Sequence, residues 1–187
     1  MTKKTFGTAL VIGASRGLGL ELVRQLLAAG SRVIATVRTA EARAALQTLG
    51  AEVLTLDVAD PASVGGLARQ LGGEPFDLAF YVAGVMRRMG ATTPPTQQDF
   101  DAVMHANVLG AMQTLPQVTP LVESAGGVFA FMSSSMSQIG SVPASNAWLY
   151  RTSKAALNMV VAAAQHDYRT ATLVTIDPGW VQTDMGG

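Results

Sequence analysis

The chain has 187 residues, of which 49% are hydrophobic and 14% charged, and its 13 Lys and Arg balance its 13 Asp and Glu. This length fits one domain that buries about 70% of its unfolded surface, and an apolar chain without net charge is excluded from the disordered class. The lack of cysteine excludes disulfides and cysteine-ligated metals, and the balanced charge gives no general basic field for nucleic acid.

The first half of the chain alternates short apolar runs with amphipathic segments. The run Thr8–Ile12 is typical of a strand buried on both faces, and a glycine-rich turn follows it. Apolar residues then recur at helical spacing from Gly17 to Ala29, where Gly30 is a C-terminal signal. Further strands are predicted at Arg32–Val37, Glu52–Leu56 and Leu78–Val82. The helices expected between them run from about Ala40 to Leu49 and from Asp60-Pro61 to Gly72-Gly73.

The same alternation continues through the second half. Residues Gln97–Ser124 are predicted to form one or two helices, interrupted or kinked near Pro116 and Pro120. The remaining predicted elements are a strand at Val128–Met132, a helix from Ser145 to about Arg169 and a strand at Thr172–Ile176. This order predicts a single α/β domain over residues 1–187, with a doubly wound parallel sheet and right-handed crossovers. No apolar segment approaches the length of about eighteen residues needed to span a membrane, which favours a soluble, cytoplasmic protein.

A glycine-rich turn links the first predicted strand to the first predicted helix. It has the sequence Gly13-Ala-Ser-Arg-Gly17-Leu-Gly19. Small residues let a pyrophosphate approach the backbone, and the helix N-terminus supplies amides and a favourable dipole. The alternative is a turn that only reverses the chain. Its position directly after the first strand favours a dinucleotide site.

The end of the second predicted strand indicates which dinucleotide binds. An acidic residue there suits a ribose hydroxyl, whereas arginine suits a 2′-phosphate. The strand ends at Val37 and Arg38 without a carboxylate, and Arg16 of the glycine turn can reach the same place. Two arginines predict a preference for NADP(H), with NAD(H) as the alternative cofactor. The competing interpretation is that Arg38 is a solvated loop residue.

Tyr150 and Lys154 lie four residues apart in a predicted helix, so their side chains project from one face. A nearby ammonium favours the phenolate, and we expect it to lower the tyrosine pKa toward neutrality, where a general acid or base is most effective. The alternative is an ordinary exposed pair on a solvated helix.

Taken together, these residues resemble the short-chain dehydrogenase/reductase family. The resemblance covers nearly the whole chain in family order, and within the family it is strongest toward carbonyl reductases of the sniffer and C-factor type. It adds to the motifs above Asp57-Val58, Ala83-Gly84, Asn107, a serine run after the fifth strand, Tyr150 to Asn158, and Asp177 to Thr183.

The resemblance implies a Rossmann fold of about six strands, helices on both faces, and hydride transfer from NADPH to a ketone or aldehyde. Tyr150 would then protonate the carbonyl oxygen, Lys154 would hold ribose hydroxyls, and Asn107 would hold a water of the proton relay. The implied cofactor-binding residues are Gly13, Ser15, Arg16, Gly17, Leu18, Gly19, Arg38, Asp57, Val58, Ala83, Gly84, Tyr150, Lys154, Pro178, Gly179, Val181 and Thr183. No metal is expected, since His105 and His166 lack a partner set.

The resemblance also implies a serine that hydrogen-bonds the substrate carbonyl oxygen, and two serines compete for that role. Counting from the strand end, with Gly140 matched to the downstream glycine of the family, selects Ser134. Counting back from Tyr150 by the common family interval selects Ser137. We favour Ser134, because a strand end fixes a side chain better than a loop does.

Two departures from the family pattern support a rival function. Tyr81 and Val82 stand where the family usually has two asparagines, and the chain ends soon after Thr183, without the usual substrate-covering segment and seventh strand. A truncated chain, a mobile tail and a natural short form all explain this end. The rival is a catalytically weak or inactive nucleotide-binding regulator or interaction protein. A nucleotide-sugar isomerase or dehydratase is disfavoured, because no residues remain for its substrate domain.

Apolar residues near the motif ends bear on the kind of substrate. Either an apolar pocket or core packing accounts for Met86, Met89, Met136, Trp148, Trp180 and Met185. Arg87 and Arg88 beside them either attract an acidic substrate or are merely solvated. The expected substrate is a small apolar carbonyl compound.

The resemblance further implies a homodimer through the two long helices before the fifth and sixth strands.

Overall fold

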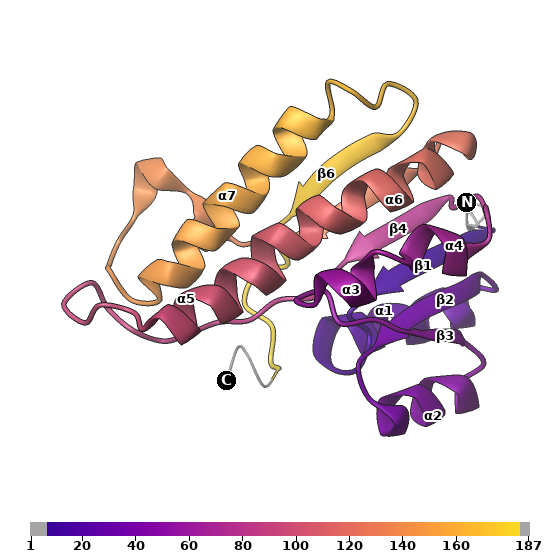
Figure 1. Cartoon of the computed structure of the whole chain (residues 1–187), viewed down its shortest axis with the longest axis horizontal. Coiled ribbons are helices and arrows are strands. Elements are labelled where there is room, and N and C mark those ends of the chain that lie inside the picture. Colours follow the sequence, from indigo (N-terminus) through magenta and orange to yellow (C-terminus); the bar gives the residue numbers. More distant parts are fainter. Residues whose placement is uncertain (1–6, 184–187) are drawn as a thin grey trace.

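The computed structural model describes residues 7–183, and they contain a six-stranded parallel sheet (Figure 1). Its strands are β1 (Thr8–Ile12), β2 (Arg32–Val37), β3 (Glu52–Thr55), β4 (Leu78–Tyr81), β5 (Val128–Met132) and β6 (Thr172–Ile176). They pair in the order β3-β2-β1-β4-β5-β6, so the direction of winding reverses between β1 and β4. Ligands of such sheets bind at this point, beyond the carboxyl ends of the strands. The predicted fold class is confirmed.

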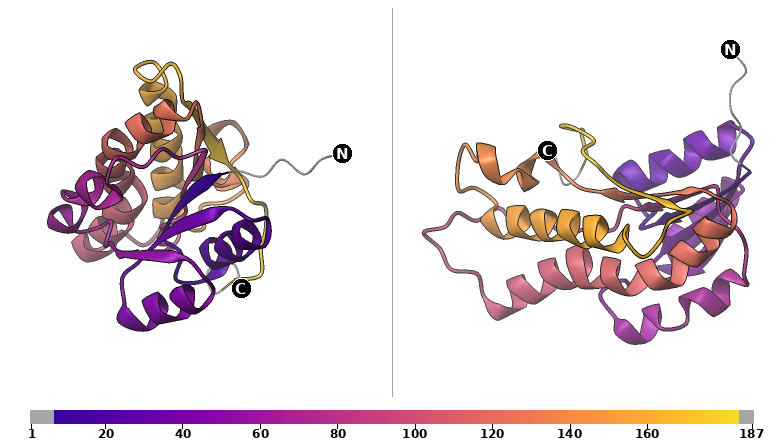
Figure 2. Two further views of the ribbon diagram at one scale, coloured as in Figure 1. Left: turned by 90° about the vertical axis from the view of Figure 1, so that its right-hand side faces the viewer. Right: turned by 90° about the horizontal axis from the view of Figure 1, so that it is seen from above.

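Helices cover the two faces of the sheet, with α1 on the opposite side from α6 and α7 (Figure 2). The helices are α1 (Gly17–Ala28), α2 (Ala40–Thr48), α3 (Pro61–Val64), α4 (Leu67–Leu71), α5 (Gln97–Met104), α6 (Gly110–Ser124) and α7 (Trp148–Ala164). Successive strand side chains point to opposite faces, so Val11 packs with the α1 and α2 core while Leu10 and Ile12 pack with the α6 and α7 core. In residues 7–183, no helix is both long and apolar enough to cross a membrane.

Two predicted helices differ from the structure by several residues in their bounds. The helix predicted from Asp60 to Gly73 is instead two short helices, α3 and α4, because Gly65 and Gly66 interrupt it. The helix predicted from Ser145 to Arg169 begins only at Trp148, since Ala147 adopts a left-handed conformation with φ 53°. Its end comes at Ala164, beyond which the amides of His166 and Asp167 donate to carbonyls three residues back.

The predicted interruption of the long Gln97–Ser124 segment lies at a different place. α6 continues through both Pro116 and Pro120. The irregularity comes earlier, in the π-helical turn η1 (His105–Leu109) that joins α5 to α6. Such turns are rare in proteins, and those that do occur often lie at functional sites.

Candidate active site

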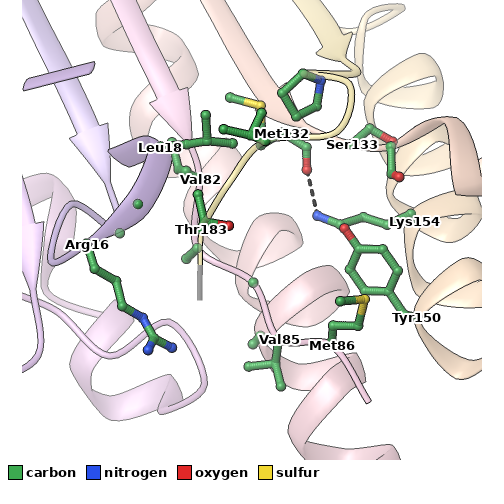
Figure 3. Close-up of a pocket in the computed structure, with 18 of the residues that line it drawn as sticks. Arg16, Leu18, Val82, Val85, Met86, Met132, Ser133, Tyr150, Lys154 and Thr183 are labelled. Carbon is green, nitrogen blue, oxygen red and sulfur yellow. Dashed lines mark hydrogen bonds between the residues drawn. The ribbon is translucent and has the colours of Figure 1, made fainter. Parts of the chain in front are cut away.

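A cavity of about 470 Å³ lies at the carboxyl ends of the strands (Figure 3). Most of the site residues expected from the sequence line this cavity: Gly13, Ser15, Arg16, Gly17, Leu18, Arg38, Asp57, Val58, Ala83, Gly84, Ser134, Tyr150, Lys154, Pro178, Gly179, Val181 and Thr183. Figure 3 shows Arg16 across the cavity from Tyr150 and Lys154, with Thr183 between them. The structure thus brings residues from seven separate segments to one site.

Two predicted residues, Gly19 and Asn107, do not line the cavity. Lining residues that sequence reasoning missed include Val37, Val85 and Met132, while Ser133 belongs to the predicted serine run. Each of these residues lies next to a predicted motif at a strand end, so its place in the site could have been inferred from that motif. Met132 contributes its backbone carbonyl, a role that no side-chain pattern indicates.

The glycine turn forms a cradle that side chains would close. Gly13 has φ 90°, and a Cβ there would lie 2.7 Å from the Ala83 nitrogen. A Cβ on Gly19 would overlap the Gly13 carbonyl oxygen, so this glycine lets α1 start close to β1. In the described part of the chain no side chain caps the N-terminus of α1. Its amides therefore suit a phosphate, and this donor set fits a dinucleotide.

The other end of the cavity is built for the adenosine half of such a cofactor. The Gly13 amide donates to Thr36 Oγ1 at 3.2 Å, which ties the glycine turn to β2. The Ala59 amide donates to Asp57 Oδ1 at 3.0 Å and fixes that carboxylate beside buried Val58. Exposed Arg38 lines the same end, so its guanidinium suits a 2′-phosphate.

Tyr150 and Lys154 lie in the first turns of α7 on the opposite wall. Lys154 is 4% exposed, and its Nζ donates to the Met132 carbonyl oxygen at 2.6 Å (Figure 3). The same Nζ lies 5.6 Å from the centroid of the Tyr150 ring. Burial disfavours the ammonium and lowers the pKa of Lys154 to about 8.

The pKa of Tyr150 is raised, which is opposite to the direction expected from the sequence. Burial of the phenol is the largest cause, and Asp177 adds to it, while the hydrogen bond with the Ser134 hydroxyl acts in the other direction. The phenol is therefore protonated at neutral pH, which is the form that donates a proton.

The two candidate serines have different surroundings. Ser134 lines the cavity and interacts with Tyr150. The Ser137 hydroxyl donates to the Ser134 carbonyl oxygen at 2.6 Å and accepts from Asn158 Nδ2 at 2.8 Å. Ser133 Oγ donates to Asn158 Oδ1 at 2.6 Å, so Asn158 holds the hydroxyls of both Ser133 and Ser137. This placement favours Ser134 as the serine that a ligand would meet.

Asn107 lies behind the cavity wall, in the π-helical turn η1. Its Oδ1 accepts from the Val85 amide at 2.7 Å, and its Nδ2 donates to the Val85 carbonyl oxygen at 2.9 Å. A Cβ on Gly84 would lie 3.2 Å from Asn107 Oδ1 and 3.6 Å from Lys154 Nζ. The glycine at position 84 thus leaves space between the amide and the ammonium.

A second cavity, of about 480 Å³, adjoins the first through Met86, Met136 and Trp180. Met89 and Arg88 also line it. Of the other residues expected here, Trp148 does not line it, and Met185 lies outside the described residues. Arg87 is turned elsewhere, with its Nε 2.8 Å from Asp99 Oδ1. An apolar wall with one basic side chain therefore stands beside Tyr150.

Comparisons with known proteins agree with this arrangement. The model of the short chain dehydrogenase family matches residues 7–187. A 1-hydroxy-2-glutathionyl-2-methyl-3-butene dehydrogenase from Rhodococcus sp. strain AD45 is 32% identical, over 95% of this chain and 79% of the relative. The C-signal of Myxococcus xanthus is 35% identical over 60% of this chain and 70% of its own. A short-chain dehydrogenase/reductase of Burkholderia multivorans, solved with bound NADP, superposes with a TM-score of 0.86 at 32% identity, covering 97% of this chain and 83% of its own.

Proposed function

The chain belongs to the short-chain dehydrogenase family, and from that premise we propose that it is an NADP(H)-dependent reductase of ketones or aldehydes. The observation that carries the proposal is the placement of Tyr150, Ser134 and Lys154 on one wall of a cavity whose other end is the glycine turn. The single-domain organisation and a cytoplasmic location stay predictions. Turnover of NADPH with a panel of carbonyl compounds tests the proposal.

The proposed mechanism assigns each side chain one task. The nicotinamide supplies the hydride when it is bound. Tyr150 donates its phenolic proton to the carbonyl oxygen of the substrate, and the Ser134 hydroxyl donates a hydrogen bond to the same oxygen. Lys154 holds ribose hydroxyls and stabilises the phenolate that remains. Asn107 holds a water on the path that returns a proton toward Lys154.

The preference for NADPH over NADH is proposed to rest on Arg38, with Arg16 as a second arginine for the same 2′-phosphate. We expect Arg38→Asp to raise the Kd for NADPH by about 10- to 100-fold, because a charge-assisted hydrogen bond is replaced by repulsion. The Kd for NADH should change little. Fluorescence titration of both cofactors measures this. Arg43→Asp is the matched control, since Arg43 bonds to Thr55 and does not line the cavity. An unchanged NADPH affinity in Arg38→Asp would contradict the assignment.

We propose that the substrate is an apolar carbonyl compound that also carries a carboxylate. Arg88 lines the second cavity among Met86, Met89 and Trp180, and its planar guanidinium matches a carboxylate in charge and geometry. Arg88→Gln should lower kcat/KM for 4-acetylbenzoate by about three- to fivefold and leave its methyl ester unaffected, as expected for an exposed ion pair. Arg87→Gln is the control, since Arg87 does not line the second cavity. Equal kcat/KM for acid and ester in the wild type would contradict it.

We propose in addition that the protein is a homodimer through α5 to α7. Large apolar side chains are exposed on these helices: Phe100 by 42%, Met112 by 52% and Met159 by 69%. The helices lie side by side in Figure 1 and Figure 2, and a second copy packed against them would cover exposed apolar side chains.

A further inference from the structure

Tyr81, at the end of β4, occupies a position where asparagine is usual in the family pattern. Its side chain is 1% exposed, and its ring stacks on Phe131 with centroids 5.9 Å apart. Its hydroxyl donates to the Ala106 carbonyl oxygen at 2.7 Å. Burial raises the pKa of this phenol, so the hydroxyl keeps its proton and acts as a donor. The hydroxyl therefore has a definite partner in the π-helical turn η1.

The carbonyl that Tyr81 reaches is one that the π-helical turn leaves without its usual helical partner. In an α-helix, the Gly110 amide would donate to the carbonyl four residues back, which is that of Ala106. In this turn the Gly110 amide donates to His105 instead. A buried carbonyl needs a donor, and the Tyr81 hydroxyl supplies one. The tyrosine thus stabilises the π register relative to the α register.

Gly110 makes room for this contact. A Cβ at position 110 would lie 2.6 Å from Tyr81 Oη and 2.6 Å from the Val58 carbonyl oxygen. Both distances are far below a normal van der Waals contact. The hydroxyl at position 81 and the missing side chain at position 110 are therefore matched features of this chain.

The π-helical turn carries Asn107, which is fully buried. Besides its two bonds to Val85, its Nδ2 donates to Ser153 Oγ at 2.8 Å, and Ser153 Oγ donates to the Tyr150 carbonyl oxygen at 2.7 Å. A change of register by one residue rotates a helical side chain by about 100°. In the α register Asn107 would lose these partners, and the Val85 backbone would lose its clamp.

We propose that Tyr81 is a positioning residue: its hydroxyl holds the His105–Leu109 turn in the π register and thereby places Asn107 against Val85 and beside Lys154. The structural part of this inference stands on the described contacts alone. Its effect on turnover rests on the proposed reductase function.

Tyr81→Phe tests the inference, because it keeps the buried ring and removes only the donor. We expect hydrogen exchange of the Val85 amide, which donates to Asn107, to speed up by about tenfold while the melting temperature changes little. With NADPH and a carbonyl substrate, kcat should fall by a similar factor and KM for NADPH should stay near wild type. Tyr168→Phe is the matched control, since Tyr168 lies outside the cavity.

Unchanged exchange of the Val85 amide in folded Tyr81→Phe would overturn the inference. If the Val85 amide exchanges faster in Tyr81→Phe but the wild type reduces no carbonyl compound, the positioning role of Tyr81 stands and the proposed function is contradicted. If Tyr81→Phe does not fold, native-state exchange of the wild type decides. The Tyr81 hydroxyl and the Val85 amide should then open in one event with the same denaturant dependence, and independent opening would overturn the inference.

Discussion

Replacement of Tyr150 by phenylalanine should lower kcat for carbonyl reduction by about 10²- to 10⁴-fold, the range typical of a lost general acid. The phenol is the proposed proton donor on the cavity wall, and burial keeps it protonated at neutral pH by raising its pKa. Lys154 keeps its bond to Met132, so the variant should still bind NADPH with a Kd within about threefold of wild type. Stopped-flow kinetics and fluorescence titration measure the two quantities.

Tyr168→Phe provides the control for this change as well, because it removes a hydroxyl from a tyrosine outside the cavity. Near-normal turnover by Tyr150→Phe would contradict the assignment. A parallel loss of NADPH binding would show that the phenol acts on cofactor binding and not on proton donation.

Ser134→Ala should have the second largest effect and lower kcat by about 10²- to 10³-fold, as removal of a hydrogen-bond donor to a developing oxyanion does. Ser137→Ala is the matched variant, with the same atoms removed three residues away. We expect it to retain most turnover, because the Ser137 hydroxyl is engaged by the Ser134 carbonyl oxygen and by Asn158.

The expected losses of thermal stability rank the two serine variants in the opposite order to the expected losses of kcat. Ser137→Ala leaves Asn158 Nδ2 without its acceptor, so we expect its melting temperature to fall more than that of Ser134→Ala. Steady-state kinetics with thermal denaturation of both variants gives both rankings. A large loss of turnover in Ser137→Ala with a normal Ser134→Ala would reverse the assignment.

The strands could be predicted well because their apolar runs are short and bounded by turn residues, and those of β1, β2 and β5 are buried from both sides. The predicted bounds of β1, β2, β5 and β6 agree with the structure residue for residue. Helix ends were less predictable, because tertiary contacts decide them. Nothing local marks Ala147 for a left-handed conformation, and yet it delays the start of α7 to Trp148.

The cavity could also be predicted in large part, since its residues follow strand ends that meet at one edge of a parallel sheet. The tyrosine pKa was predicted in the wrong direction, because residue spacing shows the neighbouring ammonium but not the burial of the phenol. The π-helical turn η1 escaped prediction for a similar reason. The donor that stabilises it, Tyr81, is 25 residues away in sequence from Ala106.

Single-turnover mixing of the purified protein with NADPH and carbonyl compounds tests most directly whether this chain transfers a hydride. We predict loss of the reduced-nicotinamide absorbance with matching formation of alcohol, and loss of both in Tyr150→Phe. Tight NADPH binding without alcohol from any ketone or aldehyde would contradict the claim and favour a nucleotide-binding regulator.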